Sequence, residues 1–195
     1  MLKDNVPAEV RITVIVLVVL YAIAYSSMIV TTAIVTASDP SDPTVFYEKL
    51  LIENEALDNG SGKELIKKHC EFFCSICKSH VIKGAKHCQF CNRCTYGFDH
   101  HCRWVGNDIG RLNYDMFIRM LLATMATLFF QIALHIAALT HLSDDRVGEV
   151  ETYMCKTDLT ILNYVTLAMS LISLVAVCLL LGFHTYIIKH NMTTL

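Results

Sequence analysis

The stretch from Lys86 to Tyr114, KHCQFCNRCTYGFDHHCRWVGNDIGRLNY, decides how this chain folds. It holds four cysteines and three histidines, and two more cysteines, Cys74 and Cys77, come shortly before it. Cysteine pairs in C-x2-C spacing beside histidines are typical of zinc ligands rather than of disulfides. The stretch therefore predicts a small domain organised by metal, in a reducing compartment where thiolates persist.

Apolar residues dominate the remainder of the chain. Of its 195 residues, 54% are hydrophobic and only 17% are charged, and the apolar ones fall into three blocks, 10–37, 116–140 and 161–188. About 20 helical residues cross the hydrocarbon core of a membrane. The expected fold class is mainly α, a polytopic membrane helix bundle with a small cytosolic Cys/His-rich double-zinc domain inserted between transmembrane helices. A net charge of −2 gives no argument for nucleic-acid binding, and we expect none.

Charge orients the three predicted spans. Basic residues outnumber acidic ones in 63–116, whereas the loop at 141–160 is acidic, and basic loops stay on the cytosolic side of a membrane. We expect no internal repeat. The expected divisions are a luminal or extracellular N-terminus at 1–9, a transmembrane helix at 10–37, a cytosolic linker at 38–73, a Cys/His-rich domain at 74–115, a transmembrane helix at 116–140, a luminal or extracellular loop at 141–160, a transmembrane helix at 161–188 and a cytosolic C-terminus at 189–195.

The Cys/His-rich domain has more candidate ligands than one metal needs. A structural zinc ion takes four ligands, so we expect two sites. His87 and Cys88 are adjacent, and in an extended chain they point in opposite directions and serve different metals. Spacing alone leaves open how the ligands divide and whether Cys102 is one of them. The candidates are Cys74, Cys77, His87, Cys88, Cys91, Cys94, His101 and Cys102.

The segment from Cys74 to Phe117 resembles the DHHC-type zinc-finger protein S-acyltransferases, or palmitoyltransferases. That family has the pattern C-x2-C-x9-HC-x2-C-x2-C-x4-DHHC-x-W-x2-NC-x-G-x2-N-x3-F, and this chain has every fixed position except one. The SDPSDP run after the first apolar block and the final MTTL resemble the family's Asp-Pro stretch and the start of its Thr-Thr-x-Glu motif. Residues 74–115 are then a DHHC zinc-binding catalytic domain. The matches beyond the first ligands are Asp99, His100, His101, Cys102, Trp104, Asn107, Gly110, Asn113 and Phe117.

The resemblance implies roles for these residues. Cys102 would be the nucleophile, with His100 as its base and Asp99 orienting His100. A free sulfur suits this role because a zinc-bound thiolate is not available for attack. Apart from the resemblance, Trp104, Arg103 and Arg111 lie where an interface anchor and a phosphate-binding surface would help to hold the acyl-CoA. The alternative is that the two arginines are solvated cations near the bilayer. One zinc would take Cys74, Cys77, His87 and Cys94, and the second would take Cys88, Cys91, His101 and the residue at position 108.

Asp108 stands where the family has a cysteine. A carboxylate oxygen binds zinc at about 2.0–2.2 Å, so we expect Asp108 to remain a ligand in a weaker site. The alternative is a surface carboxylate, with the fourth position empty or filled by water. The family also has two spans before its zinc region, whereas one is visible here. Either the N-terminus is incomplete or this member lacks the first span.

The implied activity is transfer of a fatty acyl group, palmitoyl, from acyl-CoA to cysteines of substrate proteins through an acyl-enzyme on Cys102. The expected cofactors are two Zn²⁺ ions, with palmitoyl-CoA as the acyl donor. The expected partners are the lipid bilayer and substrate proteins with membrane-proximal cysteines. We expect an integral protein of the endomembrane system (Golgi or ER) or the plasma membrane, with its zinc domain in the cytosol.

Two other interpretations stay open. A catalytically silent zinc-finger membrane scaffold of the same family would keep the metal sites and bind partners. A membrane-anchored RING-like ubiquitin ligase would need cysteine pairs separated as in a cross-brace, which the tight HC-x2-C-x2-C block does not match.

Overall fold

The structure is a computed structural model, and it describes residues 7–53, 61–70, 72–142 and 153–190. The chain divides into two compact units, one of residues 1–30 with 119–186 and the other of residues 31–118 with 187–195. Much of the predicted N-terminus at 1–9, loop at 141–160 and C-terminus at 189–195 lies outside the described residues. The side of the membrane assigned to every segment stays a prediction.

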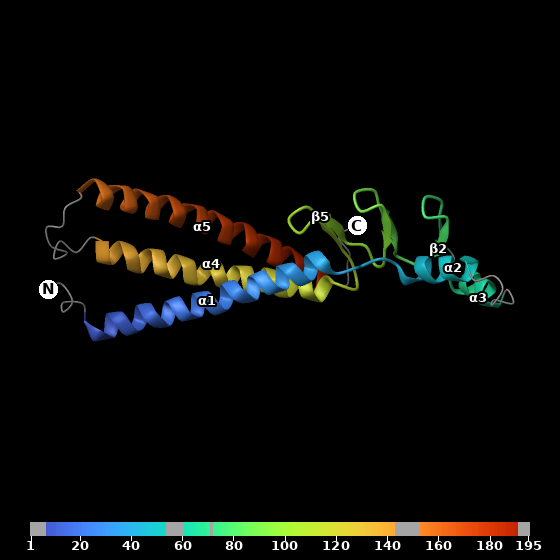
Figure 1. Cartoon of the computed structure of the whole chain (residues 1–195), viewed down its shortest axis with the longest axis horizontal. Helices are drawn as coiled ribbons and strands as arrows, with labels where there is room; N and C mark the ends of the chain where they lie inside the picture. The colour runs from blue at the N-terminus through green and yellow to red at the C-terminus, as the bar shows by residue number, and fades with distance from the viewer. Residues whose placement is uncertain (1–6, 54–60, 71, 143–152, 191–195) are drawn as a thin grey trace. The chain divides into compact units, whose positions relative to one another are not determined.

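Three long helices account for the predicted spans: α1 (Ala8–Ala37), α4 (Tyr114–Leu142) and α5 (Tyr153–Lys189) (Figure 1). Each contains a stretch long and apolar enough to cross a membrane. Most large apolar side chains of α1 and α5 are exposed, as in helices that face lipid rather than a protein core, whereas those of α4 are mostly half-buried or buried. The prediction of a mainly α fold with three spans and a Cys/His-rich domain between them is confirmed, and the helices indicate an integral membrane protein.

A polar contact joins α4 to α5 within the unit formed by residues 1–30 and 119–186. The side chains of His135 on α4 and Asn163 on α5 are hydrogen-bonded, and Asn163 Nδ2 also donates to the backbone carbonyl of His135 at 3.1 Å. Hydrogen bonds of this kind hold transmembrane helices together, because apolar side chains gain little by leaving lipid for one another.

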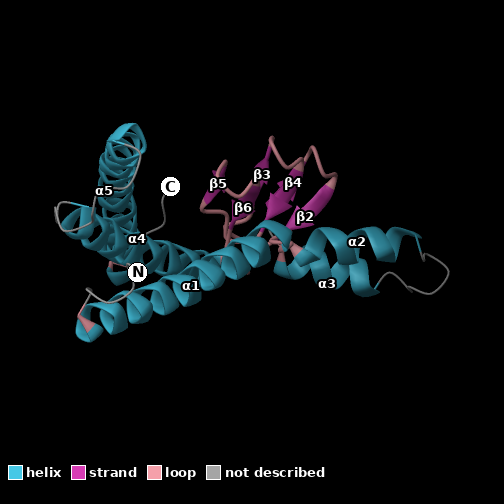
Figure 2. Cartoon of the chain, turned by 60° about the vertical axis from the view of Figure 1, so that its left-hand side comes forward, coloured by secondary structure: helices cyan, strands magenta, loops and turns pink. Residues whose placement is uncertain are grey.

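The Cys/His-rich unit contains three antiparallel β-hairpins in succession (Figures 1 and 2). Their turns are evenly spaced along the chain, and a residue with left-handed φ stands at the same place in each: Lys78 at 52°, Asn92 at 49° and Gly106 at 61°. The expectation of no internal repeat is therefore wrong. The repeat is one of backbone conformation, with few identical side chains to reveal it. The hairpins, which we number 1 to 3, pair β1 (Phe72–Cys74) with β2 (Ser79–Val81), β3 (Lys86–Cys88) with β4 (Arg93–Thr95), and β5 (His100–Cys102) with β6 (Asn107–Ile109).

The segment 38–73, expected as a linker, contains helices α2 (Pro43–Glu53) and α3 (Ser61–His69), and α2 packs against β2. Asp42 caps α2 by accepting the backbone N–H of Thr44 at 2.9 Å. The buried carboxylate of Glu48 accepts the hydroxyl of Ser79 at 2.6 Å and the backbone N–H of His80 at 2.5 Å, and it lies 2.8 Å from His80 Nδ1. These bonds make α2 part of the support for hairpin 1.

Candidate metal centres and active site

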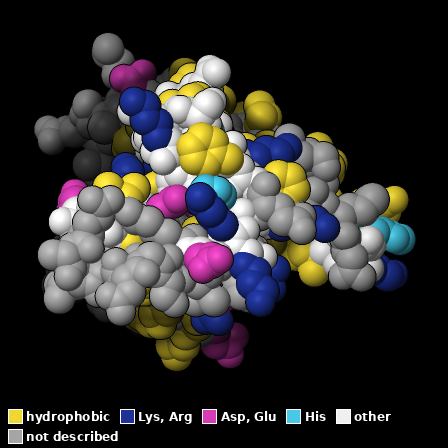
Figure 3. Space-filling model, turned by 90° about the vertical axis from the view of Figure 1, so that its right-hand side faces the viewer, with side chains coloured by type: hydrophobic (Ala, Val, Ile, Leu, Met, Phe, Trp, Pro, Cys, Tyr) yellow, Lys and Arg dark blue, Asp and Glu magenta, His cyan; other side chains and the backbone are white. Residues whose placement is uncertain are grey.

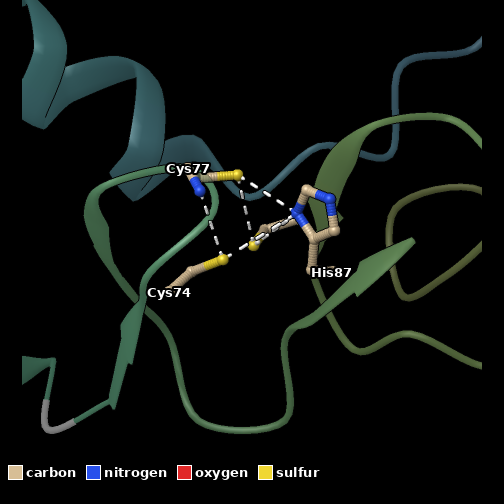
Figure 4. A group of neighbouring side chains, drawn as sticks. Cys74, Cys77 and His87 are labelled. Atoms are coloured by element: carbon tan, nitrogen blue, oxygen red, sulfur yellow. Dashed lines mark hydrogen bonds between the residues drawn. The ribbon is translucent and has the colours of Figure 1, made fainter. Parts of the chain in front are cut away.

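Hairpins 1 and 2 bring four potential ligands together. The ligand atoms of Cys74, Cys77, His87 and Cys94 all lie within 4.8 Å of one another. His87 Nδ1 is 3.8 Å from Cys74 Sγ, 3.3 Å from Cys77 Sγ and 3.8 Å from Cys94 Sγ, and Figure 4 shows Cys74 and Cys77 turned toward it. Zn–S bonds of about 2.3 Å and Zn–N bonds of about 2.0 Å place nitrogen and sulfur about 3.5 Å apart in a tetrahedral site. The group therefore suits a tetrahedral metal.

Hairpins 2 and 3 repeat this arrangement one step further along the chain. The second group consists of Cys88, Cys91, His101 and Asp108. His101 Nδ1 is 3.8 Å from Cys88 Sγ and 3.4 Å from Cys91 Sγ, nearly the distances of the first group. Asp108 Oδ1 takes the place of the third sulfur and lies 2.8 Å from His101 Nδ1. Both groups are consistent with zinc sites, and the adjacent His87 and Cys88 fall in different groups, as alternation along a strand predicts.

Cys102 occupies the corresponding place in hairpin 3. It ends the first strand of its hairpin, as Cys74 and Cys88 end the first strands of theirs. The place of the second cysteine of each pair is taken by the buried Val105. Among the described residues, Cys102 belongs to neither of these two groups of potential metal ligands, which we call the metal-like groups. Its sulfur therefore has the backbone setting of a zinc ligand without a second thiolate to share a metal.

Asp99, His100 and Cys102 form a hydrogen-bonded series. Asp99 Oδ2 lies 2.8 Å from His100 Nδ1. The hydrogen bond with Asp99, and then that with Cys102, raises the pKa of His100 to about 9 in spite of burial. Burial acts to raise the pKa of Cys102, but hydrogen bonds from His100 and from the backbone N–H groups of Val105 and Trp104 outweigh it and lower that pKa. The arrangement favours a thiolate beside an imidazolium over a neutral thiol beside a neutral imidazole.

The turn after Cys102 supplies the same stabilisation as the turns that hold the metal-like cysteines. In hairpin 1 the backbone N–H of Cys77 donates to Cys74 Sγ at 3.4 Å. In hairpin 3 the corresponding N–H groups face Cys102, and Gly106 provides the left-handed residue that closes the turn. A backbone geometry suited to a metal-bound thiolate therefore surrounds a free one.

Trp104 and Arg103 lie beside Cys102 at the surface. Trp104 is 93% exposed. The Arg103 guanidinium lies 5.8 Å from the centre of the Phe90 ring, and that ring stacks on the His101 imidazole at 4.8 Å. In the space-filling view, Lys and Arg side chains lie among apolar ones (Figure 3). Both predicted ligand-contacting residues are therefore accessible, while Cys102 itself is largely buried.

Several supporting residues have no expected role in the sequence interpretation. Asn107 Nδ2 donates to the backbone carbonyls of Val35 and Ser38, each at 2.8 Å, and so ties hairpin 3 to the end of α1. Arg93 and Thr95, on β4, contact the carboxylate of Asp108. The fixed asparagine of the motif signals Asn107. Nothing in the sequence signals Arg93 and Thr95, because their importance depends on the hairpin that lies next to them.

Comparison with known proteins places the chain in a family. The model of the DHHC palmitoyltransferase family matches residues 67–195. Palmitoyltransferase ZDHHC18 of Mus musculus is 35% identical over 122 residues, which cover 63% of this chain and 31% of that protein. Palmitoyltransferase ZDHHC9 of Homo sapiens is 34% identical over 122 residues, 63% of this chain and 32% of that protein. The probable protein S-acyltransferase 20 of Arabidopsis thaliana is 27% identical over 157 residues, 77% of this chain and 22% of that protein.

The chain therefore belongs to the DHHC palmitoyltransferase family, and the resemblance noted from the motif is confirmed. The match covers about a third of the length of the ZDHHC18 and ZDHHC9 relatives.

Proposed function

We propose that this protein is an S-acyltransferase that moves a fatty acyl group, palmitoyl in the first instance, from acyl-CoA to cysteines of substrate proteins. Family membership supports the class of reaction. The observation that carries the proposal is the series Asp99–His100–Cys102, whose sulfur stands outside both metal-like groups. A nucleophile with an adjacent base, and a third group orienting that base, is the common design of thiol and hydroxyl acyl-transfer enzymes.

The reaction proceeds in two balanced steps. In the first, the Cys102 thiolate attacks the carbonyl carbon of the acyl-CoA thioester, a new C–S bond forms, and the bond to coenzyme A breaks. The leaving thiolate takes a proton from the His100 imidazolium. In the second, His100 accepts the proton of a substrate cysteine, whose sulfur then attacks the acyl-Cys102 thioester and frees Cys102. Each step exchanges one thioester for another, so catalysis consists mainly of positioning.

Asp99 holds His100 in one orientation throughout. Its oxygen lies 2.8 Å from Nδ1, which leaves the other ring nitrogen for Cys102. The ring of the buried Phe117 meets the His100 ring edge-on at 5.4 Å and limits its rotation. Arg103 and Trp104 are proposed to contact the acyl-CoA, through its phosphates and at the membrane interface respectively.

The two groups of cysteines, histidines and Asp108 are proposed to hold two zinc ions. Bound zinc would cross-link hairpin 1 to hairpin 2 and hairpin 2 to hairpin 3. His101 belongs to the second group and is adjacent to Cys102, so this cross-link fixes the strand that carries the nucleophile. Thiolate ligands need a reducing compartment, which supports a cytosolic location for this domain.

The membrane spans suit a lipid donor and lipid-modified products. A palmitoyl chain has about fourteen methylenes, each of which contributes about 0.8 kcal/mol on burial, or about 11 kcal/mol in total. The chain therefore stays in the bilayer, and the substrates are proposed to be proteins with cysteines close to the membrane. The Golgi, the ER and the plasma membrane are the proposed locations.

Metabolic labelling with an alkyne palmitate analogue tests this function. We expect wild-type chain in membranes to carry a label that hydroxylamine removes, and Cys102→Ser to lose it. Cys70→Ser is the matched control, because Cys70 is buried and lies outside both metal-like groups. A folded, zinc-loaded wild type without label would refute the transferase and leave the silent scaffold as the better interpretation.

A further inference from the structure

The two oxygens of Asp108 have different surroundings. The residue is fully buried. Oδ1 faces His101 Nδ1 at 2.8 Å, in the place that Cys94 Sγ takes in the first group. Oδ2 faces away from the histidine, accepts the Thr95 hydroxyl at 2.9 Å and lies 3.7 Å from Arg93 Nε. One oxygen is thus directed at the metal-like group, and the other is held by β4.

The repeat of the hairpins supplies an internal comparison for β4. In the first group the residues that correspond to Arg93 and Thr95 are Ser79 and Val81. Ser79 donates to Glu48, and Val81 is buried and apolar. A thiolate has one ligand atom and no second acceptor that must be satisfied when it is buried. The polar pair Arg93 and Thr95 therefore lies next to the Asp108 carboxylate. The equivalent position in the first group is the Cys94 thiolate, which has no such pair.

Two distances around Asp108 are not those expected when it binds a metal. The distance to His101 Nδ1 is too short for two ligands of one metal, and the distance to Arg93 Nε is too long for a hydrogen bond. A nitrogen and an oxygen that share a tetrahedral zinc lie about 3.3 Å apart, compared with the 2.8 Å between His101 Nδ1 and Asp108 Oδ1. Arg93 Nε is buried and has no hydrogen-bond partner, and its 3.7 Å to Oδ2 is too long for one. Displacing the carboxylate from His101 toward Arg93 changes both distances in the required direction.

We propose that Asp108 replaces the family's cysteine as a metal ligand through Oδ1 alone, and that Arg93 and Thr95 are positioning residues that hold Oδ2. The inference rests on the proposed metal binding and not on acyl transfer. It gives the second site two thiolates where the first has three. Soft thiophilic metals and zinc itself are held less strongly by the second site, which therefore empties first when a chelator is added.

Cobalt substitution of the full chain in detergent tests the ligand. The intensity of sulfur-to-cobalt charge transfer follows the number of bound thiolates, which is five in the proposed sites. Asp108→Cys raises that number to six, so we expect the band to grow about 1.2-fold. Cys102→Ser leaves it unchanged. Loss of about a sixth of the band in Cys102→Ser would instead identify Cys102 as a sixth bound thiolate, in the place given to Asp108, and overturn the proposal.

Zinc release to a chelator tests the positioning residues. Loss of a group that orients a metal ligand weakens metal binding by about 10- to 100-fold, and we expect Thr95→Val to do this at the second site only. In an Asp108→Cys background the same change has little effect, because a thiolate has no second oxygen. Thr124→Val is the matched control, since that hydroxyl donates to the backbone carbonyl of Met120 in its own helix.

The first site, in the same molecule, reports whether each variant has folded. If Thr95→Val weakens metal binding equally in the wild type and in Asp108→Cys, Thr95 has only a structural role and does not position Asp108. Unchanged release in Asp108→Ala would refute ligation by Asp108. Both readouts are metal counts, so a chain that binds two metals but shows no acyl label would refute the proposed transferase and leave this inference intact.

Discussion

Replacing Asp99 by asparagine keeps the size of the side chain and removes its charge, which makes it a direct test of the proposed nucleophile. Asp99 is 9% exposed and lies 2.8 Å from His100 Nδ1. Its hydrogen bond is the largest influence that raises the pKa of His100 from 6.5 to about 9. A difference of that size corresponds to about 3 kcal/mol. Cys102 contributes part of this shift and His100 is 34% exposed to solvent screening, so the loss of the Asp99 charge should cost about 2 kcal/mol.

A loss of about 2 kcal/mol makes the thiolate–imidazolium pair about 30-fold less populated. In the wild type the pair persists between the lowered pKa of Cys102 and the raised pKa of His100, so thiol reactivity extends to lower pH than for an ordinary cysteine and declines on acidification through the Cys102 pKa. In Asp99→Asn the pKa of Cys102 moves up. Reactivity at pH 7 therefore falls, and the midpoint of its pH profile shifts to higher pH.

Alkylation of Cys102 by iodoacetamide, followed by mass spectrometry of its peptide from pH 5 to 10, measures both quantities. The same change at the exposed Asp115 serves as the control and should leave the profile unaltered. An Asp99→Asn profile with the wild-type midpoint and a rate within threefold of the wild type would refute the role of Asp99.

Three further changes follow from the hairpins and their support. Val105→Cys gives Cys102 a C-x2-C partner, so zinc bound by the pair should slow alkylation of Cys102 about tenfold or more, and a chelator should restore the rate. An alkylation rate that is the same with and without zinc would contradict this. Glu48→Gln removes the charge that three donors of β2 share, and should lower the free energy of unfolding of the full chain in detergent by about 2 kcal/mol, as measured by denaturant titration. Gly110→Ala places a Cβ 2.6 Å from Thr95 Cγ2 and should cost about 1–3 kcal/mol in the same titration, and an unchanged midpoint would show that the contact relaxes freely.

The sequence is informative where the physics is local. Three apolar blocks predict three spans because crossing a membrane requires a minimum apolar length, and the structure has those helices. The alternation of His87 and Cys88 along an extended strand also follows from local geometry. The Cys/His motif is specific enough to identify the family without any coordinates.

The features that sequence reasoning missed depend on backbone conformation or on contacts distant in the chain. Lys78 and Asn92 adopt the left-handed conformation without being glycine, so the turns share no glycine, and the even spacing of Cys74, Cys88 and Cys102 is the main sequence signal of the repeat. The segment around Glu48 has some amphipathic character, which predicts a helix either on the membrane or in a solvated linker, but its contact with His80, far along the chain, has no sequence signal. The contacts of Asp108 with Arg93 and Thr95 likewise depend on where β4 lies, and the spacing of residues in the sequence does not predict that.

The direction in which the repeat runs along the chain has a consequence for how the protein matures. Domains form from the N-terminal end as synthesis proceeds, and the first metal-like group is complete once Cys94 has emerged, whereas the second must wait for Asp108. Cys102 emerges between them. If the second group binds metal as proposed, a metal held early by Cys88, Cys91 and His101 would meet the Cys102 sulfur before the Asp108 carboxylate. Pairing of β5 with β6 brings Asp108 opposite His101, so formation of hairpin 3 would favour the carboxylate over the thiolate.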